Sequence, residues 1–221
     1  ISSLIDKDGH ITVKGFYDDV VELSAEDRAK LSRAPFDIEE YKEFLDIKEV
    51  KGEAGYSTLE RTGIRPCLDV NGIWGGYIGQ GAKTVLPSVA HAKISMRLVP
   101  NQDSETITRL FSEHFNAIAP DYVKVEVTPH HGGDGFLIPI SSPAYKAAEK
   151  AMTEVYGIEP VPSRGGGSIP ILADLQRILG IDPLLMGFGL ERDTIHSPNE
   201  SYLLKQLFAG MEAIALFYRY Y

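Results

Sequence analysis

The sequence Leu-Leu-Met-Gly-Phe-Gly-Leu-Glu-Arg-Asp-Thr-Ile-His-Ser-Pro-Asn-Glu occupies residues 184–200. Its apolar start predicts a short strand, which two glycines end and a polar loop follows. Ser197 is then placed to cap a helix, Pro198 suits the first helical position, and Glu200 completes a capping box. Helical spacing of apolar side chains continues through Leu203, Leu204, Leu207, Phe208, Met211 and Ile214. The stretch therefore predicts a strand, a loop and a long final helix.

His196 immediately precedes the predicted cap of that helix. The positive end of the helix dipole disfavours a charged imidazolium there, so we expect a neutral ring, which is the form that binds a metal ion. A histidine in a surface loop without a chemical role is the alternative, and for a lone histidine it is the commoner case. On this stretch alone both interpretations stay open.

The composition bounds what the rest of the chain does. A length of 221 residues allows one large domain or two small ones. The net charge of −9 argues against nucleic acid as the main partner, because few cations are available to neutralise phosphates. The single cysteine, Cys67, excludes an internal disulfide framework and a thiolate zinc cluster. No stretch approaches the roughly 20 apolar residues that a membrane span needs, so no membrane partner is predicted.

The first 65 residues predict short elements and no catalytic pattern. Residues 1–9 read as the last turns of a helix that the chain enters part-way and that ends at Gly9. The charge runs of this segment are most simply a solvated face. The expected elements are a strand at 10–13, a helix from Ser24, a helix from Asp37 to Leu45 and a loop at 52–63.

The next segment predicts an antiparallel sheet with a helix on one face. Strands are expected at 66–74, 88–99 and 123–127, and a helix from about Asp103 to Pro120. These elements make an α+β layer domain. In the second strand Arg97 belongs to the open, polar face, while the apolar face consists of Ala90, Ala92, Ile94, Met96 and Leu98.

After the glycine-rich segment 130–135 the chain alternates strands and helices, which is typical of a parallel α/β sheet. Two strands are too few for an independent sheet, so we expect this part to be a piece of a larger domain. The expected helices lie at 144–156, 168–179 and 200–221, and the expected strands at 159–162 and 181–188.

Residues 165–170, Gly-Gly-Gly-Ser-Ile-Pro, separate a predicted strand from a predicted helix. Glycines allow close backbone approach, and free N–H groups at a helix start receive anions such as phosphate or carboxylate. A nucleotide phosphate loop is excluded because it requires a Gly-Lys-Ser/Thr sequence. An ordinary glycine-rich connector capped by Ser168 stays an equal alternative.

Four motifs together resemble a known family. They are Gly-Ala-Lys-Thr-Val-Leu-Pro at 81–87, Lys-Ile-Ser-Met-Arg-Leu-Val-Pro at 93–100, Gly-Gly-Ser-Ile-Pro at 166–170 and His-Ser-Pro-Asn-Glu at 196–200. Their order and spacing are similar to those of the carnosine dipeptidase-like branch of the aminoacylase/carboxypeptidase zinc metallopeptidases, peptidase family M20. The resemblance implies a two-zinc α/β catalytic domain that is interrupted by a ferredoxin-like α+β lid. Residues 1–131 would be the lid without its first strand, and residues 132–221 the C-terminal part of the catalytic domain.

The resemblance also implies roles for individual residues. His196 matches the last zinc ligand, and the substrate-binding residues would be Thr84, Arg97, Gly167 and Ser168. Some of these contacts would come from the neighbouring subunit. The family's other metal ligands, its general-base glutamate and its lid histidine match no residue of this chain, so no catalytic residue is assigned. We expect His130 and His131 to be structural.

The function that the resemblance implies is a cytoplasmic, zinc-dependent dipeptidase that cleaves short peptides with a free C-terminal carboxylate. Its cofactors would be two Zn²⁺ ions per active site, with Mn²⁺ possible, and its partner a second copy bound through the lid. An N-acyl-amino-acid deacylase on the same scaffold is one alternative. A non-catalytic dimerisation or binding module is the other. We expect this chain to be a C-terminal fragment that is inactive alone.

Overall fold

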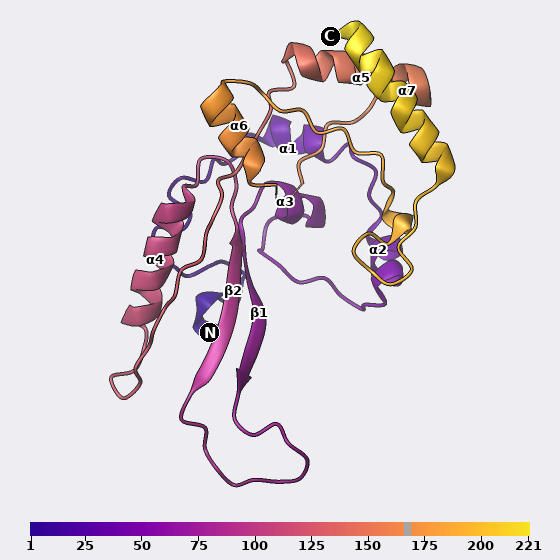
Figure 1. Ribbon diagram of the computed structural model, residues 1–221. Coiled ribbons are helices and arrows are strands. Elements are labelled where there is room, and N and C mark those ends of the chain that lie inside the picture. Colours follow the sequence, from indigo (N-terminus) through magenta and orange to yellow (C-terminus); the bar gives the residue numbers. More distant parts are fainter. Residues whose placement is uncertain (166–168) are drawn as a thin grey trace. The chain divides into compact units, whose positions relative to one another are not determined.

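The computed structural model describes residues 1–165 and 169–221. These residues form two compact units (Figure 1). The first unit comprises Ile1–Gly135 and Arg164–Pro170, and the second comprises Phe136–Ser163 and Ile171–Tyr221. The assignment of the lid and of the catalytic part to residue ranges stays a prediction.

The first unit begins with short helices. The helix starts predicted at Ser24, Asp37 and Asp103 are confirmed, and each of these side chains caps its helix by accepting a backbone N–H of the first turn. One helix lies where a loop was predicted: Ser57 and Glu60 form a complete capping box at its start. The elements are η1 (Ser2–Leu4), α1 (Ala25–Leu31), α2 (Ile38–Leu45), α3 (Thr58–Gly63), β1 (Cys67–Gly75), β2 (Ala90–Arg97) and α4 (Ser104–Ala117).

The sheet of the first unit is a two-stranded antiparallel hairpin. β1 pairs with β2 from Cys67 opposite Arg97 to Gly75 opposite Ala90, with an irregularity between Val70 and Gly72. The third strand predicted at 123–127 is wrong, since this segment is irregular in the structure. It runs beside the core without the ladder of backbone hydrogen bonds that defines a strand, although one of its valines packs against that core.

α4 and the N-terminal segment cover one face of this hairpin and enclose the core of the unit. Of the predicted apolar face of β2, the part nearest the core packs against it, whereas Ala90 and Ala92 are exposed toward the far end of the hairpin. The buried core cluster consists of Leu4, Ile11, Val13, Phe16, Leu68, Ile107 and Phe111.

The first residues differ from the predicted helix and strand. η1 is a single 3-10 turn, and Ile5 and Ile11 form an isolated antiparallel bridge across a tight turn. Gly9 closes that turn with a φ of 81°, where a Cβ would lie 2.6 Å from the carbonyl oxygen of Gly52. Close packing of two backbone segments therefore explains this glycine, rather than the end of a helix.

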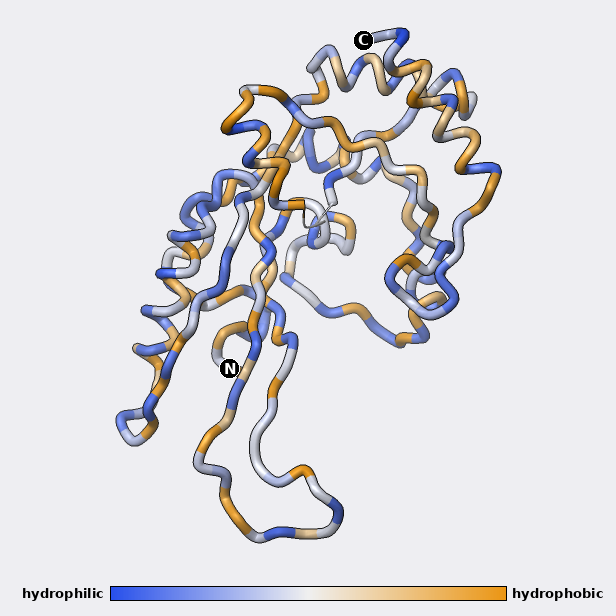
Figure 2. The backbone as a smooth tube through the Cα atoms, in the orientation of Figure 1, coloured by the Kyte–Doolittle hydropathy of each residue, from blue (hydrophilic) through white to orange (hydrophobic). Residues whose placement is uncertain are grey.

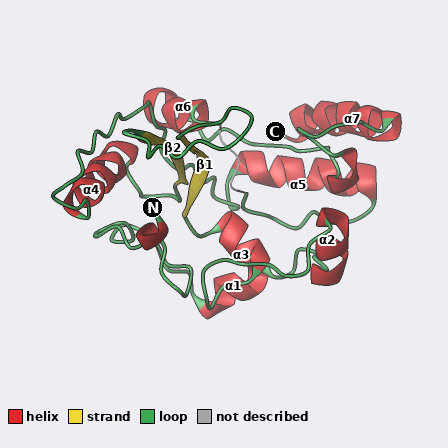
Figure 3. Cartoon of the chain, turned by 90° about the horizontal axis from the view of Figure 1, so that it is seen from below, coloured by secondary structure: helices red, strands yellow, loops and turns green. Residues whose placement is uncertain are grey.

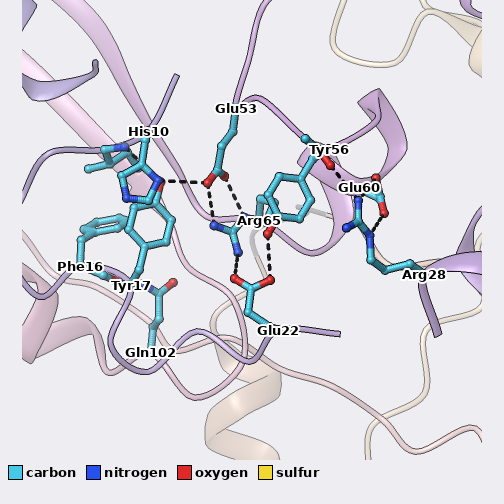
Figure 4. A network of polar contacts seen from close by, with 12 residues as sticks. His10, Phe16, Tyr17, Glu22, Arg28, Glu53, Tyr56, Glu60, Arg65 and Gln102 are labelled. Carbon is cyan, nitrogen blue, oxygen red and sulfur yellow. Dashed lines mark hydrogen bonds and ion pairs between the residues drawn. The ribbon is translucent and has the colours of Figure 1, made fainter. Parts of the chain in front are cut away.

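An ion network around the buried Arg65 is the exception to the predicted solvated charged face (Figure 4). Arg65 is only 8% exposed, and its guanidinium donates two hydrogen bonds to Glu53 and one to Glu22. Its Cζ lies 5.0 Å from the ring centroid of Tyr17 and 4.3 Å from that of Tyr56. Burial alone lowers the pKa of Arg65, but the hydrogen bonds to Glu53 raise it above its usual value. The network joins three segments that are distant in sequence.

The second unit consists of helices and irregular segments: α5 (Pro143–Tyr156), α6 (Ile171–Leu179), η2 (Glu191–Asp193) and α7 (Leu204–Tyr220). α5 and α7 lie side by side (Figures 1 and 3). Small residues allow the close approach of the two helices, since their buried side is formed by Ala147, Ala148, Ala151, Gly210 and Ala213. The described part of the chain has no helix of the length and apolarity needed to cross a membrane.

Several predictions for the second unit are wrong. The strands expected at 159–162 and 181–188 are irregular, because no neighbouring strand pairs with them among the described residues. The final helix begins at Leu204, and the turn at Ser197–Glu200 lies outside it. The apolar side chains that were expected to pack are exposed on α7, among them Leu204, Phe208 and Met211. Figure 2 shows that hydrophobic residues recur along this helix.

Candidate functional site

His196 lies in a compact loop between Gly189 and Ser201. The loop contains three non-glycine residues with left-handed φ values, Thr194 at 49°, His196 at 63° and Asn199 at 63°. The backbone N–H of His196 donates to Glu200 Oε2 over 3.3 Å, and the Ser197 N–H donates to the Thr194 carbonyl. The imidazole is exposed, so its nitrogens are accessible to a ligand.

The predicted reason for a neutral His196 ring is wrong. Glu200 reaches back to His196 and not to Ser197, and the predicted capping box is absent. α7 starts after Leu203, so His196 does not adjoin a helix N-terminus and no helix dipole acts on it at close range. The position of the His196 ring is set by the turn conformation of its loop.

The described residues provide one candidate ligand for a metal ion, His196, but no complete metal site. His196 offers an exposed imidazole, which is a common zinc ligand. Within 1–165 and 169–221, no group of three or more His, Cys, Asp or Glu side chains is arranged to hold a metal ion. His130 and His131 line a hollow beside α4 together with Ser104, Glu105 and Arg109, but within the described ranges these side chains are not arranged as a group that could hold a metal ion.

Arg97 lies where the sequence predicts it, at the exposed end of β2. It is opposite Cys67 in the register of the hairpin and belongs to the face that the core does not cover. Burial raises the pKa of the Cys67 thiol to about 11, and the hydrogen bond to Asp69 adds to this effect. Cys67 is therefore a neutral thiol at physiological pH and not a nucleophile. The guanidinium of Arg97 is the group of this pair that is suited to bind an anion.

Thr84 and Arg97 lie at opposite ends of the hairpin. Arg97 pairs with the first residue of β1, whereas Thr84 belongs to the exposed loop 76–89 that joins Gly75 to Ala90. That loop extends beyond the strand ends (Figure 1). Seven residue steps along β2, at about 3.3 Å each, separate the loop end of the strand from Arg97 by roughly 23 Å. The hairpin does not bring Thr84 and Arg97 of one chain together.

Gly167 and Ser168, the other predicted substrate-binding residues, lie outside the described residues. α6 begins at Ile171, after the predicted Ser168 start. Gly180 closes this helix as predicted, with a φ of 66° and an N–H that donates to the Gln176 carbonyl.

One residue of the His196 loop was not singled out from the sequence. Asp193 is 1% exposed, and its carboxylate Oδ2 accepts the N–H of Leu190 over 2.8 Å. The sequence gives no signal that Asp193 is buried, because aspartates in loops are mostly exposed.

Comparisons with known proteins give the relationship of the chain. Residues 10–220 match peptidase family M20/M25/M40. The Cys-Gly metallodipeptidase DUG1 of Saccharomyces cerevisiae is 31% identical over 226 residues, which cover 100% of this chain and 47% of the relative. The human Beta-Ala-His dipeptidase is 29% identical over 99% of this chain and 45% of its own length. The chain thus spans about half the length of the curated relatives that it matches.

Solved structures agree with the sequence match. An M20 family metallo-carboxypeptidase from Sulfolobus solfataricus, Sso-CP2, has a TM-score of 0.87 at 30% identity, over 99% of this chain and 50% of that one. Human carnosine dipeptidase 1 has a TM-score of 0.81 at 30% identity, over 98% of this chain and 46% of that one. The predicted family is confirmed: the chain belongs to peptidase family M20/M25/M40.

Proposed function

We propose that this chain is part of a metal-dependent dipeptidase, in which residues 1–131 act as the lid and residues 132–221 belong to the catalytic domain. The observation that carries the proposal is the match of nearly the whole chain to metallodipeptidases of yeast and human. These relatives do not favour the alternatives of an N-acyl-amino-acid deacylase or a non-catalytic module.

In this proposal His196 is one ligand of a metal site whose other ligands are not among the described residues. A pair of zinc ions, when bound, activates water and polarises the scissile carbonyl. The exposed imidazole and the constrained loop of His196 support the role of a fixed ligand. No other step of the reaction is assigned to this chain.

Arg97 binds the free C-terminal carboxylate of the substrate in this proposal. A guanidinium offers a bidentate fork for a carboxylate, and Arg97 lies on the uncovered face of the hairpin. Ser168 and Gly167 would add a hydroxyl and backbone donors. The substrate class is therefore short peptides with an unblocked C-terminus.

The positions of Thr84 and Arg97 support a dimeric site. Because they lie at opposite ends of one hairpin, a single short substrate is too small to touch both residues of the same chain. If both bind the substrate, one comes from each of two copies, and the enzyme works as a homodimer. A mixture of T84A and R97A proteins would then regain activity by forming heterodimers.

His196→Ala in the full-length protein that carries this chain tests the metal role. We expect the loss of zinc from one site and of most of the dipeptidase activity, because a catalytic zinc normally has three protein ligands. Metal content by atomic absorption and turnover of a dipeptide are the measurements. Full zinc content with normal turnover would contradict the assignment of His196.

Arg97→Ala tests the carboxylate role in the same protein. Removing a charged hydrogen-bond partner costs about 2–4 kcal/mol, so kcat/KM for dipeptides should fall roughly 30- to 1,000-fold. Dipeptide amides should be poor substrates of the wild type and should lose little further in the variant. Arg109→Ala, on the exposed surface of α4, is the matched control. Equal cleavage of acids and amides by the wild type would refute the role.

A further inference from the structure

The loop that carries His196 has an unusual backbone conformation. Thr194, His196 and Asn199 all have positive φ values, and none of them is glycine. Asn and His tolerate this region better than most residues, whereas a β-branched residue such as Thr194 is a genuine outlier there, so contacts elsewhere in the loop must hold it. Such outliers cluster at functional sites, and this cluster includes the candidate metal ligand itself.

Asp193 supplies three of the contacts that hold the loop. Its Oδ2 accepts the N–H of Leu190 over 2.8 Å, and its own N–H donates to the Leu190 carbonyl over 2.9 Å. Its carbonyl accepts the N–H of Ser201 over 2.9 Å. One residue thus connects the two ends of the segment in which His196 lies. Asp193 is almost fully buried, and the described residues place no group of three His, Cys, Asp or Glu side chains around it that could hold a metal ion.

The other carboxylate oxygen of Asp193, Oδ1, does not take part in these contacts. Asp193 Oδ1 is buried and accepts no hydrogen bond from the residues that the structure describes. A buried polar atom without a partner destabilises a fold, and each instance needs a reason. The Leu190 N–H needs only a neutral acceptor, which Asn or Ser would provide. The negative charge is therefore the property that remains to be explained, and it lies in the loop of a residue that binds a cation in the proposed function.

We propose that Asp193 is a positioning residue for His196, which fixes the loop through Leu190 and Ser201 and strengthens cation binding at the His196 ring through its buried negative charge. The inference rests on the proposed function in one respect, that His196 is a metal ligand. Mutation of residues that support a metal ligand typically lowers metal affinity on the order of 10- to 100-fold. Because the carboxylate is buried, water screens its charge less than it screens the charge of an exposed aspartate.

Asp193→Asn in the full-length protein is the decisive variant, because it keeps an acceptor for the Leu190 N–H and removes the charge. Zinc affinity, measured by competition with a chelator, should fall on the order of 10- to 100-fold, while the melting temperature of the metal-free protein stays near that of the wild type. The absorption spectrum of the cobalt(II)-loaded protein should change as well. Asp182→Asn, which makes the same change at an exposed position of the second unit, should leave affinity and spectrum unaltered.

Asp193→Ser serves as a second variant if the asparagine protein does not fold, and we expect the same loss of affinity. Wild-type zinc affinity in a folded Asp193→Asn or Asp193→Ser protein would overturn the inference. His196→Ala is measured alongside. If His196→Ala leaves the zinc affinity unchanged, the ligand assignment fails and the proposed function with it. If His196→Ala weakens zinc binding and the Asp193 variants do not, only the positioning role fails.

Discussion

The two units bury different kinds of side chain. In the first unit large residues such as Phe16, Ile107 and Phe111 are buried between the hairpin, α4 and the N-terminal segment. In the second unit the buried residues of α5 and α7 are mainly alanines, while Phe208 and Met211 are about 60% exposed or more. Burial of apolar surface is the main favourable term in folding. The first unit thus has a core of its own, and the second has mainly a contact between two helices.

The ion pairs of the two units also differ in burial. Arg65 of the first unit is buried between two tyrosines and two glutamates, whereas Arg177 and Asp174 of the second unit pair at an exposed surface. A buried charged group without its partners is costly, so the Arg65 network couples the folding of the segments that it joins. The exposed pair adds little stability. We infer that the first unit folds independently and that the second unit needs a further surface to cover α6 and α7.

Separation of the two parts should give the largest effect. We expect residues 1–131 alone to unfold in a cooperative transition with urea, because they contain the core cluster and the ion network. Residues 132–221 alone should show no cooperative transition and should bind a hydrophobic dye such as ANS, since their large apolar side chains are exposed. A sharp unfolding transition of the second fragment would remove the contrast between the units.

Truncation of one phenylalanine in each unit tests the difference at single residues. Phe16→Ala should lower the free energy of unfolding by about 3–5 kcal/mol, because Phe16 is 1% exposed within the core cluster. Phe208→Ala should change it by less than about 0.5 kcal/mol, because this side chain is 64% exposed. Urea unfolding of the chain followed by circular dichroism gives both values. Equal losses in the two variants would mean that Phe208 is covered in solution.

Removal of one arginine in each unit should have a smaller effect. Arg65→Met leaves Glu53 and Glu22 without their charged donor, and we expect a loss of about 2–3 kcal/mol. Arg177→Met breaks only the exposed pair with Asp174, and the expected change is below about 0.5 kcal/mol. The measurement is again the urea midpoint at constant slope. A stabilised Arg65→Met protein would show that desolvation of the network outweighs its attraction.

Local signals in the sequence predicted where three helices of the first unit begin. The starts at Ser24, Asp37 and Asp103 follow from neighbours within three residues, and the structure confirms them. The same kind of signal was present but unused at Ser57, where a Ser-x-x-Glu pattern starts α3. At Ser197 this pattern is misleading: Asn199 has a left-handed φ and Glu200 bonds to His196. Contacts from Asp193 to both ends of the loop override the local preference there.

Longer-range features could not be predicted from pattern alone. Alternating valines at 123–127 and the apolar run at 181–188 read as strands, but a strand exists only where a neighbour supplies hydrogen bonds. The burial of Arg65 depends on Glu22 and Glu53, which are distant in sequence. For the candidate site, Arg97 lies on the exposed face that the sequence predicted, and the roles of His196 and Arg97 stay predictions. The separation of Thr84 from Arg97 follows from the hairpin register, which no local pattern reveals.

The smallest effect concerns Glu60 and its dependence on pH. Hydrogen bonding to Arg28 lowers the pKa of Glu60 from 4.5 to about 2. Because the pKa in the folded state lies below that in the unfolded state, the stabilising contribution is complete above pH 4.5 and disappears as the pH falls toward about 2.

Glu60→Gln keeps a hydrogen-bonding group for the Ser57 cap and removes the charge, so the variant should lose about 1 kcal/mol at pH 7. Its difference from the wild type should shrink between pH 4.5 and about 2. Glu149→Gln on α5 is the control in the second unit, where the carboxylate pairs with an exposed Lys146, and we expect a smaller loss there. Urea midpoints at pH 7, 5, 4 and 3 would measure both differences, and a Glu60→Gln difference that stays constant over this range would rule out the ion pair with Arg28 as the source of its stabilisation.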